Sequence, residues 1–231
     1  MEFTMLVSQR CALSTLTLAL GFFAQTAAQA VLLTEPISPA PFADTALGGT
    51  TAALRPELAG TVLEDVLTPF SFSGITGTVQ NRVVRETASG TLDFYWKINV
   101  DASSTGGRVG AFRLADFGYA NLKDADWRMD GLGIEAPTTG RLFNVAGNPG
   151  GDINFLLDSA VPGGGASRFF FLHTDATQYA LTAKYDMLTG GSQQLSGIYS
   201  TFAPAVPEPS SYALTAMGMA VVAVYLRRRR T

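Results

Sequence analysis

The sequence contains only one cysteine and one histidine among its 231 residues. Cys11 lies in an N-terminal segment that we expect to be removed, so the mature chain would contain no thiol. This excludes structural disulfides, thiolate metal sites and a cysteine nucleophile from the mature protein. A single histidine also excludes a multi-histidine metal site, and a serine–histidine–acid triad would have to use His173.

Charged residues are scarce as well, at 15% of the chain, against 47% hydrophobic residues. Four of the 16 basic residues are consecutive, Arg227 to Arg230, and acidic residues are in excess over the rest of the chain. Because an acidic domain is poorly suited to contacting phosphates, nucleic acid is excluded as a partner. The 24 glycines, with frequent threonines and aromatic residues, indicate an ordered protein of strands and turns.

The N-terminus has the order of features found in a secretory signal peptide. Arg10 precedes an apolar run over residues 11–23, and Ala28 and Ala30 form an A-x-A cleavage pattern. The apolar run is too short to indicate a membrane span. We therefore predict a signal peptide over residues 1–30, with Met5 as an alternative start; a buried N-terminal helix is the alternative interpretation.

The C-terminus combines three features in a fixed order. Pro207, Glu208 and Pro209 come first, an uncharged apolar stretch over residues 212–226 follows, and Arg227, Arg228, Arg229 and Arg230 come last. As a helix, the stretch would be about 22 Å long, and the preceding serines can extend it toward the roughly 30 Å of a hydrocarbon core. We predict a transmembrane helix over residues 210–226 and a basic tail over residues 227–230 that stops transfer on the cytoplasmic side.

These C-terminal features over residues 206–231 resemble the PEP-CTERM sorting signal, a tail also labelled the ice-binding protein C-terminal domain. The resemblance implies recognition by an exosortase, a membrane transpeptidase of Gram-negative bacteria that make exopolysaccharide. It further implies cleavage near Pro207 to Pro209, after export and transient anchoring in the inner membrane. The protein would then reach the cell surface or the extracellular space.

The middle of the chain alternates short strand-like runs with turns. In residues 91–100, Leu92, Phe94, Trp96, Ile98 and Val100 share one face and polar residues share the other, which predicts a half-buried antiparallel strand. Further strand-length runs cover residues 109–117, 153–157, 168–174, 179–187 and 195–202, and no long helical period occurs. We predict an all-β antiparallel sandwich or jelly roll over residues 70–205. The segment over residues 31–69 is expected to be partly irregular, and its stretches 54–58 and 61–67 are compatible with an edge strand or a short helix.

Two groups of residues invite a chemical interpretation. His173 has Asp175 two residues away, but no G-x-S-x-G nucleophile motif accompanies it, so we expect a surface or strand-end histidine. Asp124, Asp126 and Asp130 alternate before a glycine, which is compatible with weak calcium binding. Because Arg128 interrupts them and no glutamate closes a loop, a solvated turn is the favoured interpretation, with Arg128 neutralising its neighbours.

Hydrolysis of glycosides would need a pair of carboxylates, and sugar binding would use exposed aromatic rings. No carboxylate is singled out by the sequence; the available ones are Asp116, Glu135, Asp152 and Asp158. The candidate stacking residues are Tyr95, Tyr119, Tyr179 and Tyr185, for each of which an ordinary half-buried strand position is favoured.

The sequence therefore predicts an exported surface or matrix protein that is not an enzyme, with no catalytic residues, metal or cofactor. Its expected partners are the export machinery, an exosortase and, before processing, the membrane. The alternatives are a carbohydrate-binding module for exopolysaccharide, a secreted hydrolase, and an ice-binding protein, for which a repeated Thr-x-Thr ladder is lacking.

Overall fold

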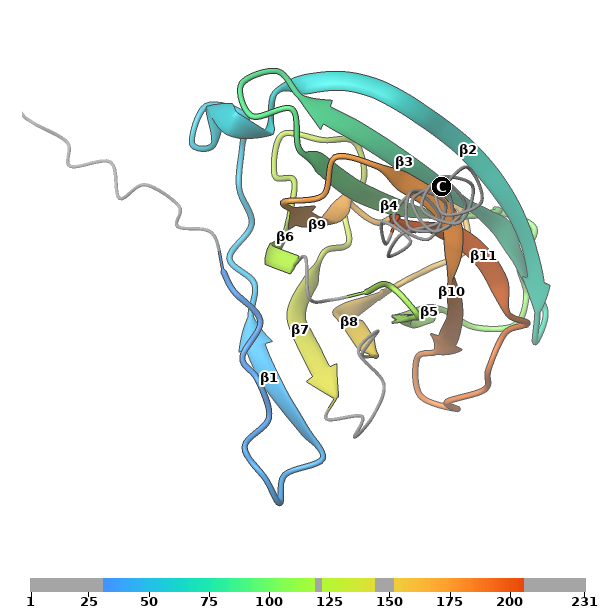
Figure 1. Ribbon diagram of the computed structural model, residues 1–231. Coiled ribbons are helices and arrows are strands. Elements are labelled where there is room, and N and C mark those ends of the chain that lie inside the picture. The colour runs from blue at the N-terminus through green and yellow to red at the C-terminus, as the bar shows by residue number, and fades with distance from the viewer. Residues whose placement is uncertain (1–30, 119–121, 144–151, 206–231) are drawn as a thin grey trace, which may run out of the picture.

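The computed structural model describes residues 31–118, 122–143 and 152–205, and these form two antiparallel β-sheets (Figure 1). The six-stranded sheet has the order β1 (Phe42–Ala46), β7 (Pro137–Phe143), β8 (Ile153–Val161), β5 (Val109–Ala115), β10 (Tyr179–Thr189), β11 (Tyr199–Pro204). The five-stranded sheet has the order β2 (Gly60–Phe72), β3 (Ile75–Glu86), β4 (Leu92–Val100), β9 (Phe170–Thr174), β6 (Leu122–Trp127). A short 3₁₀ turn, η1 (Pro56–Leu58), precedes β2.

The main hydrophobic core draws on strands of both sheets. Trp96 of β4 is 1% exposed, and its ring lies 5.6 Å from that of Phe112 and 6.3 Å from that of Phe155, both in the other sheet. Its indole Nε1 donates a hydrogen bond of 2.8 Å to Oγ1 of Thr201 in β11. The predicted all-β antiparallel class is confirmed, and two sheets around one core are consistent with the predicted β-sandwich.

The strand predicted over residues 91–100 is β4, and its predicted inner face lies in the main core. Its other face differs from the expectation, because Asp93, Tyr95 and Lys97 are also buried, at 0%, 4% and 9% exposure. The strand is therefore covered on both sides and not half-buried. The candidate functional site lies on this second side of β4.

The segment over residues 31–69 contributes to both sheets. β1 pairs with β7, and residues 61–67 lie in β2, which is an edge strand as one of the two interpretations had it. The predicted domain boundary after residue 69 falls inside β2. Residues 56–58, from the other ambiguous stretch, form the turn η1.

β3 was not predicted, because polar and small residues interrupt its apolar alternation. Gly77 stands at an inward position where a Cβ atom would lie 2.1 Å from the carbonyl oxygen of Asn99. Asn81 also points inward, and its amide donates to Thr68 Oγ1 at 3.0 Å and accepts from Thr201 Oγ1 at 3.0 Å. Both residues fit their inward positions in the sheet, but neither is a large apolar residue, so the alternation that predicts a strand is interrupted in the sequence of β3.

Candidate functional site

The outer face of the five-stranded sheet carries a second, smaller hydrophobic cluster. Leu58 of η1, Val84 of β3, Tyr95 of β4 and Phe171 of β9 are buried there, and Phe169 packs against them. The rings of Tyr95 and Phe171 lie 5.0 Å apart. Because η1 covers part of this face, residues that alternation would place in solvent become buried.

A cleft of about 520 Å³ opens beside this cluster, on the same face. That volume lies within the range of small-ligand sites. The strands β2, β3 and β4 and the residues around β6 and β9 line it: Leu58, Gly60, Val62, Gln80, Arg82, Val84, Tyr95, Lys97, Arg128, Asp130, Gly131, Leu132 and Phe169.

Three cationic side chains and a single carboxylate line the cleft. The guanidinium carbon of Arg82 lies 4.7 Å from the centre of the Phe169 ring, and Lys97 Nζ lies 5.8 Å from it. Arg128 forms a two-point ion pair with Asp130, at 2.8 and 3.0 Å. The cleft is thus positively charged, although the protein as a whole has a net charge of −3.

Lys97 has no carboxylate partner among the residues that the structure describes. None of the ion pairs between described residues includes it, although only 9% of the residue is exposed. Arg82 donates from one terminal nitrogen to Asp65 at 2.7 Å, while its buried Nε has no hydrogen-bond partner among these residues. Since buried polar groups are normally paired, Arg82 Nε is suited to an anionic ligand, and the Lys97 ammonium adds a second positive charge in the same cleft.

A polar cluster lies on the same face, toward β6. Asp93 of β4 pairs in register with His173 of β9, and His173 Nδ1 lies 2.8 Å from Asp93 Oδ1 and 3.0 Å from Glu86 Oε1. Burial raises the pKa of Asp93 to about 6, although the hydrogen bond and charge of His173 act in the opposite direction. Burial acts to lower the pKa of His173, but the hydrogen bond to Asp93 and the surrounding carboxylates outweigh it and raise that pKa.

His173 is the penultimate residue of β9, so it lies at a strand end as one of the two interpretations had it, but it is not a surface histidine, because its side chain is only 17% exposed. Its acidic neighbours come from adjacent strands, whereas Asp175 lies beyond the end of β9. The arrangement also differs from a catalytic triad, because the hydroxyls of Ser89 and Thr91 donate to Glu86 and not to the imidazole.

The three aspartates proposed for calcium hold residues 49–55 against β6. Arg55 donates to both carboxylate oxygens of Asp124, at 2.7 and 3.1 Å, and the backbone N–H of Gly49 donates to Asp126 at 2.7 Å. The backbone N–H of Ala52 donates to Asp130, also at 2.7 Å. The three carboxylates are bound to three different points along residues 49–55, and among the described side chains they do not form a common ligand group.

The favoured interpretation of these residues as a solvated turn is wrong for two of them. Asp124 and Asp126 lie in β6 and are each 1% exposed, because residues 49–55 cover them. The expected neutralisation by Arg128 is confirmed for Asp130, whose pKa the hydrogen bond from Arg128 lowers to about 2. Burial acts to lower the pKa of Arg55, but Asp124 and Glu57 outweigh it and raise that pKa.

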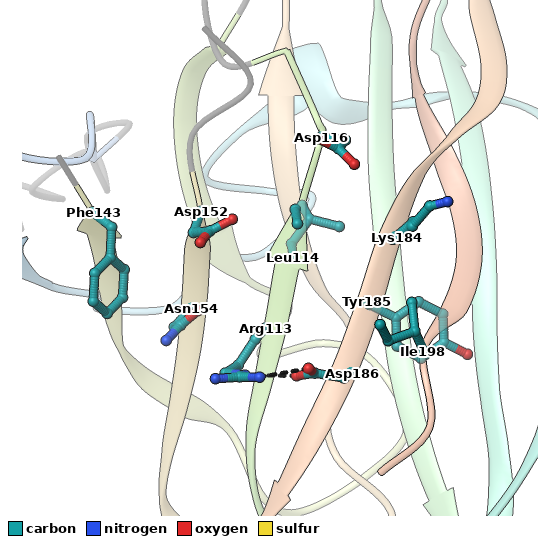
Figure 2. A pocket seen from close by; sticks show the side chains of 11 residues that line it. Arg113, Leu114, Asp116, Phe143, Asp152, Asn154, Lys184, Tyr185, Asp186 and Ile198 are labelled. Atoms are coloured by element: carbon teal, nitrogen blue, oxygen red, sulfur yellow. Dashed lines mark hydrogen bonds and ion pairs between the residues drawn. The ribbon is translucent and has the colours of Figure 1, made fainter. Parts of the chain in front are cut away.

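A second pocket, of about 380 Å³, lies on the six-stranded sheet. Figure 2 shows Asp116 at one end of it and the ion pair of Arg113 and Asp186 at the other. Asp152 also lines it, so two of the four carboxylates considered for hydrolysis share this pocket. Burial raises the pKa of Asp152, as do the charges of Asp116 and Asp186, while Arg113 opposes them.

The other residues considered for hydrolysis or sugar stacking are dispersed. Asp158 is exposed on β8, and Glu135 forms an isolated bridge with Ser167. Tyr185 is 1% exposed in the main core, and Tyr179 bonds Glu64 at 2.8 Å. Tyr119 lies outside the described residues. Only Tyr95, among the candidate stacking residues that the structure describes, lines the cleft on the five-stranded sheet.

Comparison with known proteins adds evidence from the C-terminus. Residues 205–230 match the model of the PEP-CTERM protein-sorting motif. The chain carries a PEP-CTERM sorting signal. This confirms the resemblance found in the sequence, and the motif implies export and membrane-anchored processing by an exosortase of a Gram-negative bacterium. No curated protein and no solved structure matches the chain significantly.

The PEP-CTERM residues themselves, Pro207 to Pro209 and Arg227 to Arg230, lie outside the described residues, as do the signal-peptide residues Ala28 and Ala30. The predicted signal helix and transmembrane helix fall in the same undescribed ends. Within the residues that the structure describes, no helix has the length and hydrophobicity needed to cross a bilayer.

Proposed function

We propose that this chain is an exported surface protein, without enzymatic activity, that binds acidic exopolysaccharide through the cleft on its five-stranded sheet. The proposal depends mainly on Lys97, a nearly buried cation that has no carboxylate partner in the part of the chain that the structure describes. It lies in a cleft lined by three cations on an acidic protein. The sorting motif supports the extracellular setting, because it implies export by an exosortase pathway.

The chemistry of the cleft favours an anionic polymer over a neutral one. Charge-assisted hydrogen bonds from Lys97 and Arg82 suit carboxylate or sulfate groups, which recur along acidic polysaccharides. The ring of Phe169 already faces both cations, so it orients them more than it offers a free stacking surface. The hydroxyls of Ser89 and Thr91, which lie near this cluster, donate to Glu86 and not to the His173 imidazole, which favours a binding role over a triad-type hydrolase.

Replacing Lys97 by methionine is expected to weaken binding of polygalacturonate or alginate by about 10-fold or more, since a charge-assisted bond contributes about 1.5–3 kcal/mol. Methionine keeps the apolar stem, so the melting temperature should change little. Isothermal titration at low and high salt measures the effect, and salt should weaken binding to the wild-type protein.

The matched control is Lys184→Met, which removes the same charge from an exposed position at the other pocket. It should bind as the wild type does. Equal losses in the two variants would indicate nonspecific charge attraction, and failure of the wild-type protein to bind either polymer at low salt would refute the proposed ligand.

In its native host, the mature protein is expected to begin at Val31 and end near Pro209, and mass spectrometry of the surface fraction measures both ends. Deletion of residues 206–231 should abolish the surface attachment or release that depends on processing. Replacing Pro207, Glu208 and Pro209 by alanine tests the motif while keeping the apolar stretch and the arginines. Normal surface delivery of either variant would show that sorting does not depend on this tail.

A further inference from the structure

The polar cluster on the outer face of the five-stranded sheet has the composition of a metal site. Glu86, Asp93 and His173 each offer one ligand atom, and these atoms lie within 4.8 Å of one another. They come from three neighbouring strands, β3, β4 and β9, so the sheet itself fixes their spacing. The side chains of Glu86 and Asp93 are 2% and 0% exposed.

The hydrogen bonds available to this cluster do not satisfy it. His173 Nδ1 carries at most one proton, yet it faces carboxylate oxygens of both Asp93 and Glu86. Glu86 Oε1, which lies 3.0 Å from that nitrogen, has no hydrogen-bond partner among the described residues, and the same holds for Asp93 Oδ2. Buried carboxylate oxygens normally have a partner, and an unpaired oxygen 3.0 Å from an imidazole nitrogen is placed so that both atoms could bind one cation.

The remaining contacts of the cluster orient Glu86 for such a role. Its second oxygen, Oε2, accepts hydrogen bonds from the hydroxyls of Ser89 and Thr91, which leaves Oε1 directed at His173. Hydrogen bonds to the outer oxygen of a ligating carboxylate are a usual support of metal ligands. The nearby guanidinium of Arg55 does not neutralise Glu86 or Asp93, because its nitrogens donate to Asp124 and Glu57.

We propose that Glu86, Asp93 and His173 bind a divalent transition metal ion, with zinc as the best-suited ion. One imidazole nitrogen and two carboxylate oxygens form a ligand set that zinc accepts, whereas calcium and magnesium prefer oxygen ligands alone. The ion would join β3, β4 and β9 on the face opposite the main core. This site is distinct from the three aspartates considered for calcium and from the cleft at Lys97.

The test uses the full-length chain, purified without a histidine-containing tag and stripped with a chelator. Isothermal titration with zinc chloride is expected to show one ion per chain. Asp93→Asn and His173→Gln should each weaken binding by more than about 10-fold. Asp186→Asn, which removes a carboxylate from the ion pair on the other sheet, is the matched control and should bind zinc as the wild type does.

A second measurement needs no variant, because the chain has a single histidine. Saturating zinc should shift the imidazole ring resonances of His173 in the NMR spectrum and should stop their titration with pH. If the two carboxylates instead hold a protonated imidazole, zinc will leave these resonances and the melting temperature unchanged. That result, or undiminished zinc binding by the folded His173→Gln protein, would overturn the proposal.

Discussion

Replacing Trp96 by alanine is expected to lower the free energy of unfolding by about 3–5 kcal/mol, the usual cost of removing a large buried aromatic side chain. Trp96 is 1% exposed and contacts rings from both sheets, including Phe112 and Phe170. The substitution would leave a cavity between the sheets and remove the only donor found for Thr201 Oγ1 among the described side chains. Urea unfolding followed by far-ultraviolet circular dichroism measures the change.

Two further variants test the separate contributions of the hydrogen bond and of burial to the effect of Trp96→Ala. Trp96→Phe should cost clearly less than Trp96→Ala, because it keeps much of the ring packing and loses the bond to Thr201. Trp127→Ala, at a half-buried position in β6, should also cost less. A loss of less than about 1 kcal/mol for Trp96→Ala would contradict the shared core of the two sheets.

Replacing Arg55 by methionine is expected to destabilise the protein by about 3–5 kcal/mol, because the substitution leaves a buried carboxylate without its counterion. Arg55 is 2% exposed and binds both oxygens of Asp124, which is 1% exposed. The loss comes mainly from Asp124, so the double variant Arg55→Met with Asp124→Leu should recover most of the stability.

Arg141→Met is the matched control for this prediction. Arg141 forms a similar two-point pair with Asp44, at 2.6 and 2.8 Å, but both side chains are partly exposed. Its loss should be about 0–1 kcal/mol, since water already solvates an exposed pair. Equal effects of Arg55→Met and Arg141→Met in urea unfolding would show that residues 49–55 do not exclude water from Asp124.

The sequence was sufficient for the fold class and for strands with an uninterrupted alternation. β4 was predicted because five apolar residues alternate without a break, while Gly77 and Asn81 concealed β3. The outer face of β4 was misjudged for a different reason. Alternation shows which residues share a face, but it does not show that η1 and Phe169 cover the second face.

The candidate site was harder to predict, because its residues become neighbours only through strand pairing. The sequence suggested Asp175 as the acidic neighbour of His173, whereas the register of β4 with β9 places Asp93 there. The sequence did indicate that Lys97 and Asp93 lie on the same, polar face of one strand. Their partners, Phe169 and His173, lie more than 70 residues further along the chain.

The docking of residues 49–55 on β6 also constrains the order in which the protein folds. β1 pairs with β7, and Gly49 bonds Asp126, 77 residues later in the chain. Residues 42–55 come before β6 and β7 in the chain. Their backbone N–H and C=O groups therefore stay hydrogen-bonded to water until those later strands are available for pairing. The β2–β3–β4 meander, whose pairings are local, can form first and offer a surface to the later strands. Closure of the N-terminal segment is therefore a late step, completed only once residues 122–143 have arrived.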